Sequence, residues 1–260
     1  MLPANIRDNI VHSHEGLTYG GVIFEENSKA IECKYILDAI VLYLEQSNLK
    51  EIRFKLIPTL YNDLMTNDLD YFIFKNNGIL YKKNMNLAID LRSDFKITKS
   101  KLKLFKRKQK SNIIIKKDEF FDDFWNLVLV PRLMEKHKVK PIHSLDEIKK
   151  LAMKFPDNIH QYSIYEDNNI VAGITIFESN NCVKSQYGAI TLKGQTIRAL
   201  DLLFIYLIKK YKKEGKKYFD MGIVNIGDSF NLGLLNQKQE LGCSVYNQDF
   251  YKLKLTNIQL

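Results

Sequence analysis

Side chains able to do chemistry gather in one stretch near the start of the chain, His12-Ser13-His14-Glu15-Gly16-Leu17-Thr18-Tyr19-Gly20-Gly21. An unperturbed imidazole has a pKa of about 6.5, so His14 is a candidate general base at neutral pH. The alternative is that His14 only hydrogen-bonds within the loop. His12 would face the opposite side of a strand, so only one histidine is expected to serve. Glu15 is predicted either to orient His14 or to be an exposed loop acid.

A second group of polar residues lies in Gln186–Glu240. This stretch predicts a strand end, a helix over 197–211, a strand over 218–222, a polar loop and a last helix. In α/β proteins, ligands gather where strand ends meet loops and helix N-termini, because free backbone N–H groups there can bind polar substrates. The sequence therefore predicts that the chemistry lies in this stretch.

The elements that must position these residues begin with short strands around residues 4–13 and a helix over 29–46, for which Ser28 is the predicted cap. A strand over 51–56 and a short helix from Pro58 follow. The alternation of apolar residues then predicts an antiparallel pair over 71–74 and 80–91.

The later part of the chain predicts a basic helix over 100–110, a strand over 112–116 and a helix over 119–138 with a kink or break at Pro131. Trp125, within that helix, is predicted to be a core residue. Ser144 and Glu147 form a predicted capping box. Three strands over 161–165, 170–177 and 182–189 come before the Gln186–Glu240 stretch, and a strand over 245–255 follows it.

The net charge of +9 is unevenly distributed, because residues 96–117 hold ten Lys or Arg and no acid. Such a run favours an anionic partner, namely a nucleotide, phosphopantetheine, tRNA or a membrane surface, although a solvated helix face is the plain alternative. Three well-separated cysteines predict neither a disulfide framework nor a zinc site, and no metal is expected.

The chain has no apolar run of the roughly 18 residues that a membrane span needs, and no signal peptide follows Met1. A cytoplasmic protein is predicted. The sequence also lacks the P-loop, dinucleotide-binding, His-Glu-x-x-His and Gly-x-Ser-x-Gly motifs, so the corresponding NTPase, dehydrogenase, zinc protease and serine hydrolase classes lose their usual support.

The two halves of the chain repeat one pattern. Tyr19-Gly20-Gly21, a helix and Ile52-Arg53-Phe54 correspond to Tyr187-Gly188-Ala189, a helix and Tyr218-Phe219-Asp220, at a nearly constant offset. This predicts a duplicated unit; two unrelated generic α/β units are the alternative. The predicted division is residues 1–95 as an incomplete first unit, 96–111 as a linking helix and 112–260 as the second unit.

The order of predicted elements in the second half resembles the GNAT N-acyltransferase fold, with a tandem, mostly antiparallel mixed α/β arrangement over the whole chain. The residues that carry the resemblance are 13–21, 186–187, 199–201, 218–222 and 231–238. They are similar to those of FemAB-like proteins, in particular the acyltransferases of surface-polysaccharide biosynthesis. Members of this kind usually carry a further strand and helix before the segment that begins here at Leu2.

The resemblance implies transfer of an acyl group to an amine, which requires a proton acceptor, a group that polarises the carbonyl and alignment of the two substrates. Tyr187, and Tyr19 at the equivalent position, can donate to the oxyanion or stack on a sugar or base; core tyrosines are the alternative. Asp220 can bind a substrate ammonium or hydroxyl, or be a cap or turn acid. For Asp201 a structural role is favoured.

Further predicted substrate contacts are Gln186, Asn225, Asn231, Asn236 and Lys238. Asn231 can also cap the last helix, and Lys238 is either a phosphate contact or a surface lysine. GNAT enzymes hold the CoA pyrophosphate on a glycine-rich loop, which here is represented by Lys193 and Gly194 alone. FemAB-like proteins in general lack that loop.

The resemblance thus implies an N-acyltransferase that uses acyl-CoA or acyl carrier protein and acylates the amine of a nucleotide-linked amino sugar. Two alternatives stay open: an aminoacyl-tRNA-dependent transferase that acts on a cell-wall precursor, and a non-catalytic binding protein with this fold.

Overall fold

Local hydrogen bonding sets several helix ends in the computed structural model, which describes residues 1–25, 27–62, 67–108 and 112–255. Helix α5 (Leu145–Lys154) starts with the predicted capping box. Ser144 Oγ accepts from the Glu147 N–H at 3.2 Å, and the Glu147 carboxylate accepts from the Ser144 N–H at 2.7 Å. Helix α8 (Leu232–Glu240) starts at Asn231, whose Oδ1 accepts from the Leu234 N–H at 2.9 Å. Both predicted caps are confirmed.

The chain divides into two units, residues 1–85 with 246–260, and residues 86–245. The division falls inside strands β4 (Ile79–Asp90) and β12 (Ser244–Lys254). It differs from the predicted division around residues 96–111, because most of the last strand belongs to the first unit and the basic segment to the second. The assignment of β12 to the first unit depends on its pairing with β3, which no local sequence pattern predicts.

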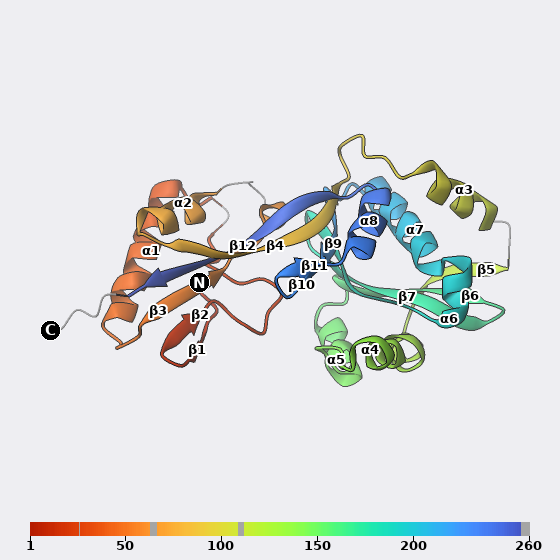
Figure 1. Cartoon of the computed structure of the whole chain (residues 1–260), viewed down its shortest axis with the longest axis horizontal. Helices are drawn as coiled ribbons and strands as arrows, with labels where there is room; N and C mark the ends of the chain where they lie inside the picture. The colour runs from red at the N-terminus through yellow and green to blue at the C-terminus, as the bar shows by residue number, and fades with distance from the viewer. Residues whose placement is uncertain (26, 63–66, 109–111, 256–260) are drawn as a thin grey trace. The chain divides into compact units, whose positions relative to one another are not determined.

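The first unit contains β1 (Asn5–Arg7), β2 (Ile10–His12), helix α1 (Ala30–Glu45), β3 (Glu51–Lys55), a 3₁₀ turn η1 (Thr59–Tyr61) and helix α2 (Asp68–Lys75) (Figure 1). Its strands have the order β1-β2-β3-β12, and among these described pairs only β2–β3 is parallel. Leu37 of α1 and Ile73 of α2 pack with Ile52 and Phe54 of β3 in the unit's core.

The predicted strand over 71–74 is wrong, because these residues belong to α2. Leu69, Phe72 and Ile73 recur at helical spacing and pack on the core, which alternation within so short a window cannot reveal. Asp68 and Asp70 in the first turn complement the helix dipole.

Two predicted helix details also change. The residue that caps α1 is Lys29 rather than Ser28, and the Glu32 carboxylate accepts from the Lys29 N–H at 2.6 Å. The helix predicted to kink at Pro131 instead runs as a π-helix, η2 (Phe124–Leu129), into α4 (Val130–His137). Pro131 is the second residue of α4 and directly follows the π-helical turns. Trp125 is in the core as predicted, with 1% of its surface exposed.

The second unit adds helix α3 (Lys99–Lys108), strands β5 (Ile113–Asp118), β6 (Ile159–Glu166), β7 (Asn169–Glu178) and β8 (Cys182–Ile190), helices α6 (Leu192–Ile197) and α7 (Ala199–Lys213), strand β9 (Tyr218–Ile223) and the hairpin β10–β11 (Asn225–Ile226, Ser229–Phe230). The strand order is β4-β9-β8-β7-β6-β5. Of the neighbouring strands described here, β8 and β9 pair in parallel and the others are antiparallel.

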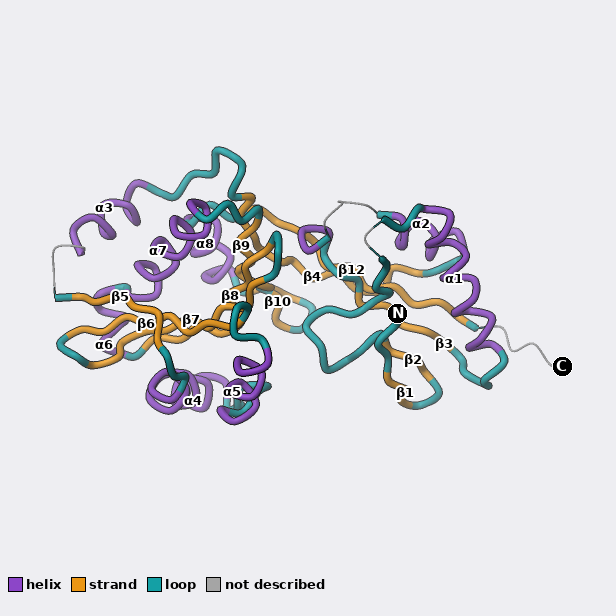
Figure 2. Tube along the Cα trace, turned by 180° about the vertical axis from the view of Figure 1, so that it is seen from behind, coloured by secondary structure: helices purple, strands orange, loops and turns teal. Residues whose placement is uncertain are grey.

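Helices cover both faces of this second sheet (Figure 2). On one face, Phe124, Trp125 and Val128 of η2 pack with Tyr187 of β8 and with α5. On the other, α7 packs along the sheet, and Phe204 and Tyr211 lie against Phe219 of β9 with ring centroids 6.4 and 6.2 Å apart.

Each unit contains a parallel strand pair joined by a helical crossover. In the first unit α1 connects β2 to β3, and in the second α6 and α7 connect β8 to β9. Each register has three residue pairs, Ile10–His12 with Glu51–Arg53, and Cys182–Lys184 with Tyr218–Asp220. The predicted repeat therefore corresponds to the same β-α-β element in both units.

Candidate functional site

The parallel ladder between β8 and β9 ends before either strand does. Its last pair is Lys184 with Asp220, although β8 continues to Ile190 and β9 to Ile223. Gly188–Ile190 and Ile223–Ile226 instead line a cavity of about 600 Å³. The ends of the two strands are therefore open to a ligand, and we call this space the strand-end cavity.

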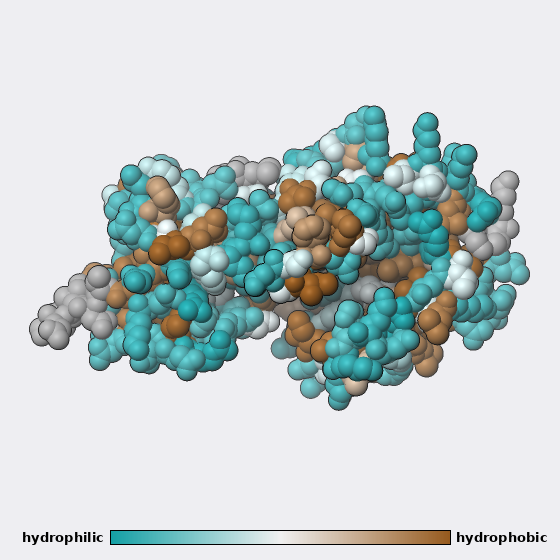
Figure 3. Space-filling model, in the orientation of Figure 1, coloured by the Kyte–Doolittle hydropathy of each residue, from teal (hydrophilic) through white to brown (hydrophobic). Residues whose placement is uncertain are grey.

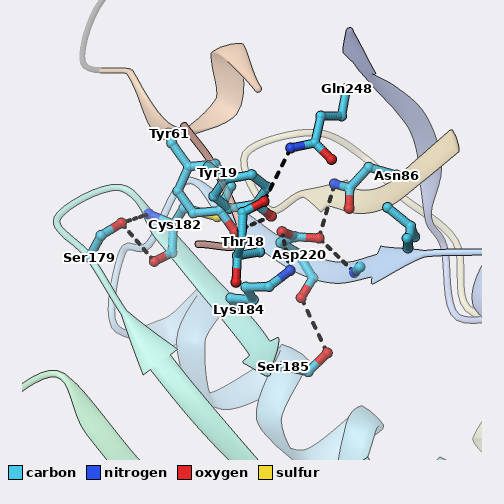
Figure 4. Close-up of polar contacts among 12 residues, drawn as sticks. Thr18, Tyr19, Tyr61, Asn86, Ser179, Cys182, Lys184, Ser185, Asp220 and Gln248 are labelled. Atoms are coloured by element: carbon cyan, nitrogen blue, oxygen red, sulfur yellow. Dashed lines mark hydrogen bonds and ion pairs between the residues drawn. The ribbon is translucent and has the colours of Figure 1, made fainter. Parts of the chain in front are cut away.

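A cluster around Asp220 fixes the point at which the ladder ends (Figure 4). The Asp220 side chain is fully buried, and its carboxylate accepts from Asn86 Nδ2 at 3.0 Å and from the Gly222 N–H at 2.7 Å. Lys184 Nζ lies 3.1 Å from the other carboxylate oxygen. Gly222 has a φ of +78°, which favours glycine at this turn. Asp220 therefore links β4, β8 and β9. Its hydrogen bond from the Gly222 N–H is the kind of turn contact that was the predicted alternative to substrate binding.

The charged groups at the strand-end cavity are mostly cationic. Helix α4 contributes the cations Arg132 and Lys136 together with the imidazole of His137, and the cation Arg198 lies just before α7. The single acid among the described lining residues is Asp201. Neutral amides and apolar side chains form the remaining wall, namely Gln195, Asn225, Asn231, Gln237, Leu133, Leu200, Val224 and Leu234.

Asp201 already has enough partners to balance its charge. Lys101 Nζ lies 2.8 Å, Arg198 Nη2 2.7 Å and Gln237 Nε2 3.0 Å from its carboxylate oxygens. Burial alone would raise the pKa of Asp201, but the hydrogen bonds from Gln237 and Lys101 and the charges of Lys101 and Arg198 hold it below its ordinary value. These contacts make Asp201 a structural anchor at the cavity edge.

Exposed apolar residues continue from the cavity onto the surface. Ile223, Ile226, Phe230 and Leu232 are each more than two-fifths exposed. Figure 3 shows apolar surface gathered over β10, β11 and α8. One side of the cavity mouth is therefore apolar, whereas the α4 side is cationic.

The other predicted substrate contacts, on α8 and in the segment before it, lie in different places. Asn225 and Asn231 line the cavity, and Asn236 is exposed on α8. Lys238 is only 5% exposed, and its Nζ donates to the carbonyl oxygens of Gly222 at 2.9 Å and Ile223 at 3.1 Å. Burial lowers the pKa of Lys238 to about 8. Lys238 is thus not a surface lysine. It is buried and donates hydrogen bonds to the last residues of β9.

Lys193 and Gly194, predicted to contact the donor phosphates, are engaged within the protein. The Gly194 N–H donates to Thr191 Oγ1 at 3.0 Å, and Lys193 Nζ lies 3.3 Å from Glu166 and 3.5 Å from Asp167. A Cβ at Gly194 would lie 2.2 Å from the Val171 carbonyl oxygen, so close packing against β7 requires this glycine.

Tyr187 lies one residue before the cavity lining on β8, next to a bulge. The β7–β8 register shifts so that Thr175 pairs with Tyr187 and Ile176 with Ser185, which leaves Gln186 as the extra residue. The Tyr187 oxygen lies 2.6 Å from His143 Nδ1 and 3.2 Å from the His143 backbone nitrogen. Its ring packs edge-on against Trp125 at 5.2 Å, and burial raises its pKa. The ring of Tyr187 thus packs in the core, which was the predicted alternative. Its phenolic oxygen contacts His143.

The histidine loop belongs to the first unit. Glu15 contacts Arg7 at 3.0 Å and His12 at 3.3 Å, so it pairs with the other histidine rather than with His14. Among the described residues, His14 Nδ1 has no hydrogen-bond partner. The Tyr19 hydroxyl donates to Tyr61 at 3.1 Å.

The three residues predicted to be catalytic therefore lie in different surroundings. His14 is in the first unit, and Tyr187 and Asp220 are on adjacent strands of the second. None of them lines the strand-end cavity or the large cavity within the first unit. His143, Arg132 and Arg198 were not predicted from the sequence, because no motif distinguishes them from other surface residues. Within the described residues no group of His, Cys, Asp or Glu could hold a metal ion.

No family model matches the sequence, and no curated protein is significantly similar to it. Solved structures are similar in fold. FemX matches with a TM-score of 0.67 at 12% identity over 97% of this chain and 87% of FemX. L-PGS from Bacillus licheniformis matches with a TM-score of 0.64 at 14% identity over 95% of this chain and 79% of L-PGS.

A tandem GNAT protein from the clavulanic acid biosynthesis pathway matches with a TM-score of 0.52 at 8% identity, over 95% of this chain and 75% of that one. These likenesses establish the fold: the protein is a mixed α/β chain with the GNAT-type acyltransferase fold, and the fold predicted from the sequence is confirmed. Among the described residues, no helix is both long and apolar enough to cross a membrane.

Proposed function

We propose that the protein is an N-acyltransferase of the FemAB-like GNAT type. It transfers an acyl group from acyl-CoA or an acyl carrier protein to the amine of a nucleotide-linked amino sugar, in the cytoplasm, during surface-polysaccharide synthesis. The donor's acyl arm enters the strand-end cavity between β8 and β9. The amine attacks the thioester directly in a ternary complex, with no covalent enzyme intermediate.

The observation that carries this proposal is the charge of the strand-end cavity. Lys136 suits the phosphates of CoA or phosphopantetheine, and so do the guanidinium N–H groups of Arg132 and Arg198 that are not used in their pairs with Glu135 at 2.5 Å and Asp201 at 2.7 Å. An aminoacyl donor would instead bring an ammonium group, for which the described lining has one carboxylate, Asp201, already held by Lys101 and Arg198. Placing an ammonium group there without a free acid is unfavourable. The cavity thus favours an uncharged acyl group on a phosphate-bearing carrier.

The carbonyl of the thioester needs a hydrogen-bond donor at the transition state. The bulge at Gln186 provides a backbone N–H outside the regular ladder, close to the Gly188–Ile190 wall of the cavity. His14 is the proton acceptor that the sequence predicts, and its unpaired Nδ1 supports that role. Normal turnover of His14→Ala at saturating substrate would remove this assignment.

A specific observation favours the aminoacyl-tRNA alternative. Lys99, Lys103, Lys106 and Arg107 are exposed on α3, whereas Lys101 is buried against Asp201. An exposed cationic helix suits a phosphate backbone, and tRNA affinity would then fall steeply with salt. The absence of tRNA binding at low salt would exclude this alternative.

The deciding experiment incubates the protein with acyl-CoAs and nucleotide-linked amino sugars in all pairings and detects acylated product by mass spectrometry. A mass shift on the amino sugar is expected for at least one pairing. A transferase that uses aminoacyl-tRNA gives product only with the charged tRNA and a cell-wall precursor. A non-catalytic binding protein gives no mass shift under any pairing.

The cavity assignment has its own test. The double variant Arg132→Glu/Lys136→Glu is expected to weaken acyl-CoA binding about 10- to 100-fold, since it replaces two charge-assisted contacts with repulsion. Lys150→Glu/Lys154→Glu, a reversal of two exposed lysines of α5 outside the described lining, changes the net charge by the same amount and is the matched control, which should leave affinity unchanged. Equal effects of both variants would assign the change to net charge rather than to the cavity.

A further inference from the structure

The hydroxyl of Tyr187 has a partner that determines the direction of its hydrogen bond. The His143 backbone N–H can only donate, so the phenolic oxygen accepts from it at 3.2 Å. The Gln186 side chain also approaches the phenol as a donor. The proton of the hydroxyl group then points to the remaining neighbour, His143 Nδ1, at 2.6 Å. This network assigns His143 the tautomer with its proton on Nε2.

We infer that Tyr187 and His143 form a proton relay that deprotonates the acceptor amine, in which Tyr187 contacts the amine and His143 is the positioning and proton-storing residue behind it. The inference rests on the proposed function. It replaces His14 as the acceptor of the amine proton, so His14→Ala should then keep normal turnover. It also reverses the role predicted for Tyr187, because a phenolic proton committed to His143 is not available to an oxyanion. The backbone N–H at the Gln186 bulge then polarises the thioester carbonyl.

The steps balance in protons and electrons. The amine nitrogen bonds to the thioester carbon while the carbonyl π pair moves to oxygen, which gives a tetrahedral intermediate with N–H⁺. The nitrogen passes one proton to the Tyr187 oxygen, and the Tyr187 proton moves to His143 Nδ1. Collapse re-forms the carbonyl and breaks the C–S bond, and the leaving thiolate is protonated by the imidazolium or by water.

The surroundings of the pair suit this role. Trp125 and Phe177 pack against the two rings, so the hydrogen bond is held in an apolar environment. Burial raises the pKa of Tyr187, so the phenol remains protonated at neutral pH. The charged group that acts on the pair from α5 is Glu147, whose pKa is lowered chiefly by its hydrogen bonds to Ser144. In this relay the substrate amine replaces the Gln186 amide as the second donor to the phenolic oxygen.

Two variants separate relay from packing. His143→Asn keeps a side-chain oxygen near the Nδ1 position and can accept from Tyr187, but it cannot hold a proton. A drop in kcat of about 100-fold or more with little change in KM is expected, together with loss of the acidic limb of the kcat profile. Tyr187→Phe should match it, and the double variant should lose no more than either single variant. Imidazole should partly restore His143→Ala.

A second measurement does not depend on turnover. In ¹⁵N NMR of the histidine side chains, with the His143→Asn variant as the assignment control, His143 should be protonated on Nε2 in the neutral form. Protonation on Nδ1, or kcat of His143→Asn within about threefold of the parent, overturns the relay. If no donor and acceptor pair reacts at all, the proposed function fails while the NMR result still tests the hydrogen-bond direction.

Discussion

The two parallel strand pairs differ at the point where each ladder ends. In the first unit, hydrogen bonds from the loop after β2 continue past the end of the β2–β3 ladder. The Ser13 N–H donates to the Arg53 carbonyl at 2.9 Å, Ser13 Oγ accepts from the Lys55 N–H at 2.8 Å, and the Gly20 N–H donates to the Lys55 carbonyl at 3.0 Å. In the second unit, β8 and β9 separate after Lys184 and Asp220, and the strand-end cavity takes that place.

A small residue makes the closed end possible. A Cβ at Gly20 would lie 1.8 Å from the Ser13 carbonyl oxygen, so the loop can return to β3 only through glycine. At the repeat-equivalent position, a Cβ on Gly188 would make ordinary contacts, 3.8 Å from Ile174 and 3.9 Å from Leu200, and this residue lines the cavity. The same β-α-β element thus ends in loop-to-strand hydrogen bonds in one unit and beside the strand-end cavity in the other, although Gly20, Gly21 and Leu56 also line the first unit's cavity.

The cavities of the two units also differ in charge. The large cavity within the first unit, about 690 Å³, has the acids Glu25, Asp68, Asp70 and Asp249 and the cation Lys29 among its described lining residues. The strand-end cavity has Arg132, Lys136 and Arg198 together with one paired acid. The difference is consistent with the proposal above, in which the phosphate-bearing donor binds in the second unit.

The largest expected effect comes from closing the open end. Gly188→Trp places an indole in the strand-end cavity, where space for a Cβ exists, and should weaken acyl-CoA binding at least about 100-fold. Isothermal titration calorimetry measures the change. Leu192→Trp on α6, exposed and outside the lining, is the control. Undiminished binding in Gly188→Trp would place the donor elsewhere.

Breaking the anchor at the cavity edge is expected to cost stability. Lys101→Met leaves the buried Asp201 carboxylate with Arg198 and Gln237 alone and should destabilise the fold by about 3 kcal/mol in urea unfolding. Adding Asp201→Leu removes the uncompensated charge, so the double variant should regain most of that loss. A double variant no more stable than Lys101→Met would show that the pair contributes through packing instead.

Burial of Lys238 next to the end of β9 predicts that the stability of the fold depends on pH. The pKa of Lys238 is lowered from 10.5 to about 8, so its protonated form is disfavoured in the folded state. That cost is complete below pH 8 and disappears as pH rises toward 10.5, because only the unfolded chain then binds the proton. Relative to Lys238→Met, the parent should gain about 2 to 3 kcal/mol between about pH 7.5 and 10. A pH-independent difference contradicts this.

The smallest effect is expected at the closed end. Ser13→Ala leaves the Lys55 N–H without its 2.8 Å acceptor and should destabilise the protein by about 1 to 2 kcal/mol. Acyl-CoA affinity should not change, because the proposed donor site lies in the second unit. Weakened donor binding in this variant would mean that the two strand ends do not act separately.

Short-range patterns predicted much of the fold. The capping box at Ser144, the cap at Asn231 and the three strands before the strand-end cavity follow from residues within a few positions of one another. The prediction of a strand over 71–74 was wrong. Helix α2 is short, and which of its residues face the core depends on the side chains packed against it. The location of β12 in the first unit depends on β3, a partner that is remote in the sequence.

The site was predicted less completely than the fold. Tyr187, Asp220, Asn225 and Asn231 lie on or beside the strand ends of the second unit, in the stretch where the sequence placed the chemistry. Their partners were not predicted, because His143 is 44 residues from Tyr187 and Asn86 is 134 from Asp220. A polar side chain's chemistry depends on such neighbours, and only packing brings them within hydrogen-bond distance.

By itself, the sequence determined where most helices and strands begin, that the β-α-β pattern occurs twice and that cations are in excess, since these follow from local propensity and composition. Only the tertiary structure decided which strand end stays open, that Asp201 is neutralised by a lysine 100 residues away and that burial lowers the pKa of Lys238. The physical reason is that hydrogen-bond partners and desolvation are properties of the space around a residue, which distant segments of the chain create together.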